Sequence, residues 1–336
     1  MPAEMDQIPV IDISPLVLDG IKKMAAAQQI GEACRSYGFF YIKGHGVDEV
    51  LQNQLENGSK KFFSLPLETK MKIHMSLGGR AWRGYFAFGE ELTGGMADQK
   101  EGLYFGQELP IDDPLVKAQV PLQGPNLFPD DDLPSFRQVI VDYQKAMTSV
   151  GQTLMLGIAI SLGLPEDYFY LRYTREPTAL FQIMNYPPAK DPSDFKWAIS
   201  EHTDYGILTV LKQDNAGGLE IKRPSGEWIK APPIPGTFVC NIGDMLDRMT
   251  GGVFKSTLHR VRSPLTNVPR LSFPFFFDPN FFADVQPIAG ITLQPDDKDQ
   301  RWDKESIHKL SGVYGDYLVK KVSRVFPLLK TQVLEY

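Results

Sequence analysis

The sequence predicts a mainly β fold with flanking α-helices, built around a double-stranded β-helix, or jelly-roll, core. Between residues 180 and 277, eight short β-rich runs follow one another, separated by turn residues such as those at 224–226 and 233–236. Short strands at this regular spacing are typical of a barrel or a double-sheet jelly roll. The first half of the chain is dominated by helical spacing. Because neither a linker nor an internal repeat divides the halves, residues 1–336 are expected to form one integrated domain.

The elements of the first half follow from local patterns. The run 8–13 alternates apolar and polar residues as a strand does, and 39–43 is rich in aromatic residues. Gly38 suits the end of a helix, and Pro66 suits the first turn of one. The helix-rich amino-terminal part, about 1–175, is therefore expected to contain strands over 8–13 and 39–43 and helices over 19–36, 47–64, 66–75 and 133–162.

The second half is expected to hold the jelly-roll core, over about 178–285. Its short runs of β-branched and aromatic residues predict strands at 180–185, 197–204, 207–213, 218–222, 228–230, 236–241, 258–261 and 271–277. A carboxy-terminal helix is expected over about 302–326.

Residues 78–130 lack clear periodicity and are rich in glycine, proline and aromatic residues. A long aperiodic segment is usually functional or disordered, and its aromatic content argues against disorder. One interpretation is a pocket for a small polar substrate, such as an amino acid derivative; the other is plain aromatic packing over the core. The candidate substrate-binding residues are Arg83, Tyr85, Glu91, Thr93 and Tyr104 in this segment, with Tyr205 and Phe276 on the barrel side.

Composition limits the possible partners. The 35 basic and 41 acidic residues give a net charge of −6, so the chain as a whole has no electrostatic attraction to nucleic acid. No window approaches the ~18 apolar residues that a membrane span needs, and residues 1–7 lack the pattern of a signal peptide. Cys34 and Cys240 lie far apart, which is typical of reduced thiols. A soluble, cytoplasmic protein is expected, and its oligomeric state is left open.

The sharpest chemical signal is His202-Thr-Asp204, followed by His259. Side chains two apart on a strand point to the same face, so His202 and Asp204 can converge on one ion. His259 lies in another strand-like run and could reach the same point from across a barrel. Two histidines and one carboxylate are the facial triad of non-haem Fe(II) sites. A lone His-x-Asp is more often structural, so this signal depends on the other motifs.

A second signal is Arg270-Leu-Ser272, which places a guanidinium and a hydroxyl on one face of a strand. Such a pair is suited to binding a carboxylate. An isolated Arg-x-Ser is usually an exposed strand, but the aromatic run 273–277 predicts partial burial here. A buried arginine needs an anionic partner.

These motifs resemble those of the iron- and 2-oxoglutarate-dependent oxygenases of the isopenicillin N synthase-like superfamily. The resemblance covers nearly the whole chain, and its other ordered matches are Ile8–Asp12, Tyr37–Gly46, Asn185–Pro188, Asn241–Met245 and Phe275–Pro279. It implies a jelly roll with iron at its mouth. It also implies oxidation of a small-molecule substrate, by hydroxylation, desaturation or oxidative cyclisation, using Fe(II), 2-oxoglutarate and O2 and releasing succinate and CO2.

The resemblance also implies individual roles. By motif position, His202, Asp204 and His259 would be the iron ligands, Arg270 and Ser272 would bind the distal carboxylate of 2-oxoglutarate, and Tyr186 would assist cosubstrate binding. One departure concerns the residues before Tyr186. Plant members commonly read Asn-Tyr-Tyr-Pro, whereas this chain has Met184 where the family asparagine falls, so that role is not transferred to Asn185.

Two further functions remain open from the sequence. The first is an iron oxidase of the same fold that uses no 2-oxoglutarate, because such enzymes can bind a substrate carboxylate at the same arginine. The second is a catalytically silent ligand-binding barrel, against which the intact triad argues.

Overall fold

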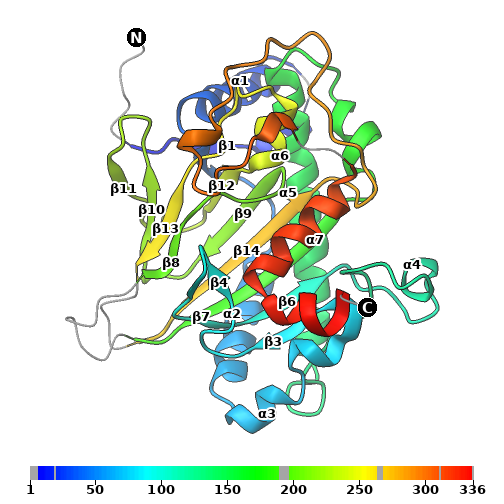
Figure 1. Ribbon diagram of the computed structural model, residues 1–336. Coiled ribbons are helices and arrows are strands. Elements are labelled where there is room, and N and C mark those ends of the chain that lie inside the picture. The colour runs from blue at the N-terminus through cyan, green and yellow to red at the C-terminus, as the bar shows by residue number, and fades with distance from the viewer. Residues whose placement is uncertain (1–6, 19, 189–196, 263–267, 310–311, 335–336) are drawn as a thin grey trace.

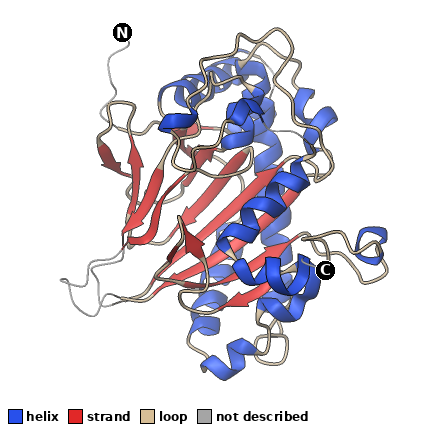
Figure 2. Cartoon of the chain, in the orientation of Figure 1, coloured by secondary structure: helices blue, strands red, loops and turns tan. Residues whose placement is uncertain are grey.

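The computed structural model describes residues 7–18, 20–188, 197–262, 268–309 and 312–334. Two large β-sheets and a small two-stranded one are surrounded by helices (Figure 1). Residues 1–6, which carry most of the segment considered for a signal peptide, lie outside the described residues. The strands run through the middle and left of the view, and helices lie above, below and to the right of them (Figure 2).

The larger sheet has eight strands in the order β1-β2-β12-β9-β14-β7-β6-β3. Their bounds are β1 (Val10–Asp12), β2 (Phe39–Lys43), β3 (Gly84–Phe86), β6 (Glu101–Gly106), β7 (Thr178–Tyr186), β9 (Leu208–Gln213), β12 (Phe238–Ile242) and β14 (Arg270–Asp278). Only β1 and β2 pair in parallel; the other neighbours in this sheet are antiparallel. Four of its strands come from the helix-rich amino-terminal part, which therefore shares the sheet with the core.

The smaller sheet has four antiparallel strands in the order β11-β10-β13-β8. They are β8 (Trp197–His202), β10 (Leu219–Lys222), β11 (Trp228–Lys230) and β13 (His259–Arg262). A separate two-stranded hairpin is formed by β4 (Leu92–Thr93) and β5 (Met96–Ala97). Each strand expected in the core is present, with ends displaced by at most two residues.

The helices are α1 (Ile21–Ser36), α2 (Glu49–Phe63), α3 (Leu67–Met71), α4 (Pro114–Lys117), α5 (Phe136–Ser161), α6 (Asp244–Met249), α7 (Tyr314–Val325) and α8 (Pro327–Leu329). The longest, α5, packs on the larger sheet and buries Ile140, Met147, Leu154 and Ile158 on one face. At Gly151 the helix approaches β14 so closely that a Cβ atom would lie 2.5 Å from the ring of Phe277.

Strand β14 shows how the two sides of the larger sheet differ. Phe273, Phe275 and Phe277 point to the helices and belong to the main hydrophobic core. The alternate residues face the smaller sheet, because side chains of a strand point to opposite faces in turn. Arg270 and Ser272 are on this second side, as their spacing predicted, and they line a cavity between the sheets.

Two parts of the chain differ from the expectation. The segment 78–130 contributes β3 and β6 to the larger sheet, and β6 pairs with β7 along its whole length. The two glycines of β6 and the shortness of the strands hide the period-two pattern in the sequence. The carboxy-terminal helix, expected from residue 302, begins only at Tyr314. Lys304 has a φ of 57°, which an α-helix does not accommodate, and residues 310–311 lie outside the described ones.

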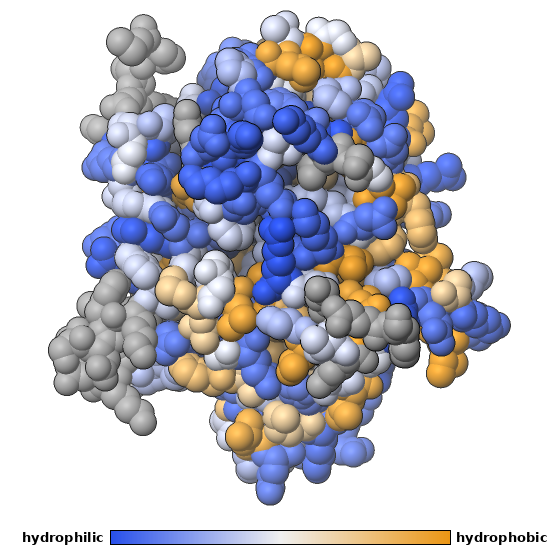
Figure 3. Space-filling view, viewed as in Figure 1, coloured by the Kyte–Doolittle hydropathy of each residue, from blue (hydrophilic) through white to orange (hydrophobic). Residues whose placement is uncertain are grey.

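The face of the molecule in Figure 3 is largely hydrophilic, and apolar side chains gather on it in separate patches. Within the described ranges, no helix combines the length and the apolar character that crossing a bilayer requires.

Candidate active site

Two histidines and one aspartate meet at one end of the smaller sheet. His202 is the last residue of β8 and His259 is the first residue of β13, and antiparallel pairing places them directly opposite each other. Asp204 Oδ1 lies 3.8 Å from His202 Nε2 and 3.6 Å from His259 Nε2. One ligand atom from each of the three residues lies within 4.8 Å of the other two, so the three can share one metal ion.

This arrangement differs in two ways from the one expected. The sequence predicts Asp204 on the same strand as His202, but β8 ends at His202 and Asp204 lies in the loop that follows it. The backbone carbonyl of Asp204 accepts a hydrogen bond from the N–H of Asp244, 2.8 Å away, which fixes this loop against the start of α6. His259 was expected from across the barrel; it comes from the strand next to β8.

The Nδ1 nitrogen of each imidazole, which faces away from Asp204, has a hydrogen-bond partner. His202 Nδ1 lies 2.8 Å from the carbonyl oxygen of Ser200, and His259 Nδ1 lies 3.1 Å from that of Thr257. Because a carbonyl oxygen can only accept, each Nδ1 carries a proton, and in the neutral imidazole Nε2 then keeps its lone pair for a metal. Burial, and then the neighbouring His259, hold the pKa of His202 well below its usual range, so it is neutral, as a metal ligand must be.

The carboxylate of Asp204 is also oriented by its neighbours. Its Oδ2 accepts hydrogen bonds from Thr209 Oγ1 at 2.5 Å and from Asn241 Nδ2 at 2.6 Å. Its Oδ1 is the oxygen that faces the two histidines. Two neutral imidazole nitrogens and one carboxylate oxygen on one side of a common centre are the donor set of the facial triad for non-haem Fe(II).

Arg270 lies in the cavity between the sheets, and only 1% of the residue is exposed. Its Nε donates to the carbonyl oxygen of Gly217, and its Nη1 has no hydrogen-bond partner. Among the described residues, no carboxylate lies within ion-pair distance of this guanidinium. A buried, uncompensated cation is costly, so the arrangement fits an anionic ligand that binds beside Arg270.

Tyr186 and Ser272 complete the surroundings of Arg270. Tyr186 is its cross-strand partner on β7, and the guanidinium carbon lies 4.6 Å from the centre of the Tyr186 ring. The Tyr186 hydroxyl donates to Met184 Sδ at 2.9 Å. Ser272 lines the same cavity two residues along β14. One space is thus bordered by the planar guanidinium of Arg270, the hydroxyl of Ser272 and the phenol ring of Tyr186. A guanidinium and a hydroxyl in this position can bind a carboxylate.

Two adjoining cavities meet at the triad. The Arg270 cavity lies between the sheets, and besides Arg270, Ser272 and Tyr186 it is lined by Phe39, Met184, Ile199, His202, Asp204, Thr209, Leu211, Leu219, Asn241, His259, Val261, Pro274 and Phe276. The Glu91 cavity is lined by Glu91, Thr93, Lys100, Tyr104, Leu180, Gln182, Met184, Ile199, His202, Thr203, Asp204, Tyr205, Gly206, Phe276, Asp278, Trp302, Leu318, Val322, Val325 and Phe326. His202 and Asp204 belong to both, so a metal there would be reached from two sides.

Five of the seven candidate substrate-binding residues line the Glu91 cavity: Glu91, Thr93, Tyr104, Tyr205 and Phe276. The other two are in neither cavity. Arg83 is buried and donates to the backbone carbonyl oxygens of Gln107, Leu122 and Gly124, so it holds loops together.

The hydroxyl of Tyr85 donates to Glu101 Oε2 at 2.5 Å, and the same oxygen lies 2.7 Å from Lys70 Nζ. The structure therefore gives Tyr85, like Arg83, a role in packing, and the expectation that these two line the pocket is wrong.

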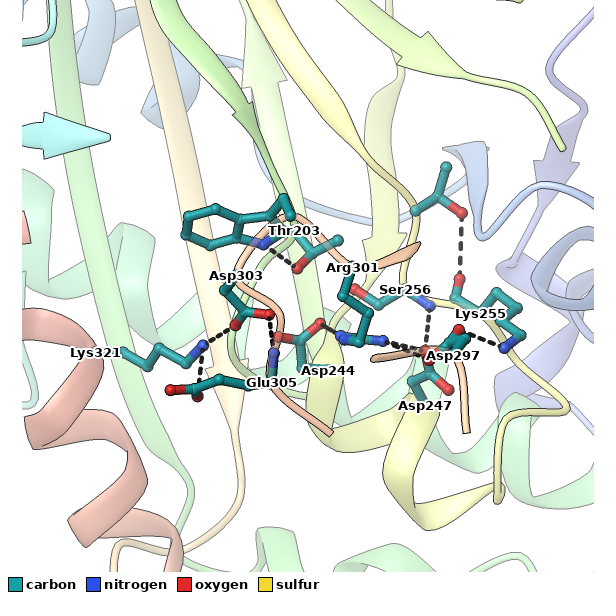
Figure 4. A network of polar contacts seen from close by, with 12 residues as sticks. Thr203, Asp244, Asp247, Lys255, Ser256, Asp297, Arg301, Asp303, Glu305 and Lys321 are labelled. Carbon is teal, nitrogen blue, oxygen red and sulfur yellow. Dashed lines mark hydrogen bonds and ion pairs between the residues drawn. The ribbon is translucent and has the colours of Figure 1, made fainter. Parts of the chain in front are cut away.

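Several residues of the Glu91 cavity were missed in the sequence. Trp302 comes from the segment between β14 and α7, and its Nε1 donates to Thr203 Oγ1 at 2.8 Å. Arg301 fixes this segment by ion pairs with Asp244 and Asp247 (Figure 4). Lys100, Gln182 and Asp278 come from three further strands or strand ends. Because these residues are scattered over the chain, no local motif could have revealed them.

The chain matches two family models. Residues 8–131 match the non-haem dioxygenase in morphine synthesis N-terminal family, and residues 168–279 match the 2OG-Fe(II) oxygenase superfamily. The second match contains the triad, Arg270 and Ser272.

Relatives and solved structures agree with these matches. The chain is 49% identical to a probable iron/ascorbate oxidoreductase of Dictyostelium discoideum, over 98% of both chains, and 42% identical to a 1-aminocyclopropane-1-carboxylate oxidase of Dictyostelium mucoroides, over 97% of both. It is also similar to the crystal structure of a full-length Neurospora crassa protein in complex with alpha-KG and 5-formyluracil, with a TM-score of 0.77, 30% identity and coverage of 94% of this chain and 96% of that one.

The family matches, the relatives and the geometry of the site lead to one conclusion. The chain belongs to the 2OG-Fe(II) oxygenase superfamily and is a non-haem, Fe(II)- and 2-oxoglutarate-dependent dioxygenase of small-molecule substrates.

Proposed function

We propose that His202, Asp204 and His259 hold the iron, that 2-oxoglutarate occupies the Arg270 cavity, and that the substrate occupies the Glu91 cavity. The observation that carries this assignment is that the two cavities share His202 and Asp204. A cosubstrate on one side of the metal and a substrate on the other can then react at one centre. When bound, iron and 2-oxoglutarate supply the oxidising chemistry with O2, and succinate and CO2 are released.

The protein's own residues bind and orient the cosubstrate in this proposal. The guanidinium of Arg270 and the hydroxyl of Ser272 bind its distal carboxylate, and Tyr186 packs on the guanidinium. Leu219 and Val261 give the cavity an apolar wall, which suits the short carbon chain between the two ends of 2-oxoglutarate.

We propose further that the substrate is a small polar molecule, such as an amino acid derivative. Glu91, Thr93 and Lys100 are polar groups set among aromatic side chains of the Glu91 cavity, which suits a polar molecule of limited size. The Dictyostelium mucoroides relative is named as an oxidase of an amino acid, 1-aminocyclopropane-1-carboxylate. The cytoplasm remains our proposed location, supported by Cys34 and Cys240, which are free and buried.

The test starts from the anaerobic Fe(II) protein. Addition of 2-oxoglutarate should produce the visible absorbance band of a metal-bound 2-oxo acid, and Asp204→Ala or His259→Ala should lose both bound iron and this band. His45→Gln is the matched control, because His45 stacks on Phe238 and lies outside both cavities. Near-normal iron content in Asp204→Ala would refute the ligand assignment. A substrate screen that follows succinate release and product mass would then identify the substrate.

A further inference from the structure

Two buried tyrosines on α7 have no part in the proposed function. Tyr314 is the first residue of α7 and Tyr317 follows three residues later, so both point to the same side of the helix. They are 1% and 9% exposed. Further along the same helix, Leu318, Val322 and Val325 line the proposed substrate cavity. The contacts of the two phenol hydroxyls therefore show what this part of the cavity wall is attached to.

The hydroxyl of Tyr314 is connected through one carboxylate to the loop 203–207, which joins β8 to β9 and carries Asp204. It donates to Asp278 Oδ2 at 2.6 Å, and Asp278 Oδ1 accepts from the backbone N–H of Ile207 at 3.1 Å. Asp278 is 2% exposed, and no described lysine or arginine forms an ion pair with it. This buried carboxylate therefore depends on the two donors, one from α7 and one from the loop.

Gly206 shows how closely Asp278 lies against this loop. A Cβ atom at Gly206 would lie 1.4 Å from Asp278 Oδ1, so a side chain at that position would displace the carboxylate. Burial raises the pKa of Asp278 to about 7, and the Tyr314 hydroxyl is the largest influence that lowers it. The phenol thus favours the charged carboxylate, which is the stronger acceptor for the N–H of Ile207.

The hydroxyl of Tyr317 reaches the other end of the loop through a second carboxylate. It donates to Asp244 Oδ2 at 3.1 Å, and the backbone N–H of Asp244 donates to the carbonyl oxygen of Asp204 at 2.8 Å. Asp244 Oδ1 lies 2.5 Å from Arg301 Nη2 (Figure 4). Asp244 is therefore held by α7 and by the segment after β14, and its own backbone holds the loop at Asp204.

These contacts act on the backbone of the loop, whereas Thr209 and Asn241 act on the side chain of Asp204. The N–H groups of Gly243 and Met245, on either side of Asp244, also donate to carbonyl oxygens of the loop, at 3.0 and 2.9 Å. The loop belongs to neither of the strands that it joins, so its position depends on such contacts. The place of Asp204 relative to the two histidines is therefore set in part from α7.

We propose that Tyr314 and Tyr317 are positioning residues of the metal site, because their hydroxyls fix the loop that presents Asp204 to the iron. The inference rests on the proposed function, since it takes Asp204 as an iron ligand. Neither tyrosine lines either cavity, so both act through Asp278 and Asp244. One helix thus holds a wall of the substrate cavity and the loop of an iron ligand together.

The test removes one hydroxyl at a time from the full chain, in Tyr314→Phe, Tyr317→Phe and the double variant. Anaerobic titration with a competing chelator gives the Fe(II) dissociation constant, and the 2-oxoglutarate band is recorded on the iron-loaded protein. Each single variant should raise this constant about 10-fold, the lower end of the usual effect of losing a group that orients a metal ligand, because each tyrosine acts through a carboxylate. The double variant should raise it further and displace the band.

Urea unfolding of the metal-free variants separates positioning from stability. If the tyrosines only attached α7 to the sheet, the free energy of unfolding would fall while the Fe(II) dissociation constant and the band stayed the same. The control variant is Tyr143→Phe. Tyr143 is buried on α5, its hydroxyl has no hydrogen-bond partner among the described residues, and it lines neither cavity. This variant loses the same atom and should keep both the iron affinity and the band.

Unchanged iron affinity and an unchanged band in the double variant would overturn the proposal, whatever its stability. If the double variant does not fold, the two single variants decide by the same criterion. An equal loss of iron affinity in Tyr143→Phe would overturn the proposal as well. Failure of the proposed function is recognised separately, because Asp204→Ala would then keep near-normal iron content or the unaltered protein would form no 2-oxoglutarate band.

Discussion

The side-chain amide of Asn241 holds the carboxylate of Asp204: its Nδ2 donates to Oδ2 at 2.6 Å, on the side away from the two histidines. Asn241 is part of β12, and Asp204 lies in the loop after β8, so the contact joins the larger sheet to the end of the smaller one. Thr209 on β9 donates to the same oxygen. The orientation of the proposed iron ligand is thus set by residues of a different sheet.

Asn241→Leu should weaken iron binding without removing a ligand. Loss of a partner that orients a metal ligand typically costs about 10- to 100-fold in metal affinity or activity. We expect an increase of that order in the Fe(II) dissociation constant, measured by anaerobic titration with a competing chelator. Asn241→Asp, which can share a proton with Asp204, should recover part of the affinity at low pH. Unchanged iron affinity in Asn241→Leu would show that Thr209 alone orients the carboxylate.

Arg270→Ala should raise the dissociation constant of 2-oxoglutarate steeply. Removing one partner of a buried charge pair typically costs about 2–5 kcal/mol, or roughly 30- to several-thousand-fold in affinity. Arg270→Lys should retain part of the binding, because lysine supplies the charge without the planar fork. Titration of 2-oxoglutarate into the anaerobic Fe(II) protein measures both effects. Iron content serves as the control and should stay the same, since Arg270 is not a ligand in our assignment.

Arg301→Met should lower the free energy of unfolding by about 3–5 kcal/mol, because it leaves buried carboxylates without their cation. Arg301 Nη2 lies 2.5 Å from Asp244 Oδ1, and Arg301 Nη1 lies 3.3 Å from Asp247 Oδ2; both aspartates are buried. The matched control is Arg137→Met, whose ion pairs are on the surface and should contribute at most about 1 kcal/mol. Urea unfolding measures both, and equal losses would contradict this account.

The thiol of Cys34 should not react in the folded protein. Burial raises the pKa of Cys34 to about 12, and the thiolate is the reactive form. At pH 8 only about one thiol in ten thousand is then ionised, and a shift from pH 7 to pH 9 raises that fraction without making it appreciable. Mass spectrometry after alkylation should find unmodified Cys34 and Cys240 in the native protein and both modified after denaturation. Alkylation of either cysteine in the native protein would contradict its burial. A disulfide between them would contradict the proposed reducing compartment.

Much of the fold could be predicted because its signals are local. Alternation along β14 already separates the core phenylalanines from Arg270 and Ser272, and the turn residues between the short runs mark the ends of the strands. Strand β6 could not be predicted in the same way. Its sequence Glu101–Gly106 has two glycines, and its place in the sheet depends on pairing with β7, which lies far along the chain at Thr178–Tyr186.

The sequence by itself determined the residue types of the site and their spacing: the His-x-Asp pair, the distant histidine and the Arg-x-Ser pair, each within one short segment. Only the tertiary structure decided their arrangement. The register of β8 and β13 sets His259 opposite His202, the partners of Asp204 come from β9 and β12, and the Glu91 cavity collects Lys100 and Trp302 from separate segments. The physical reason is that spacing along a strand fixes which face a side chain takes, whereas its neighbours depend on which strands pair and where intervening loops fold back.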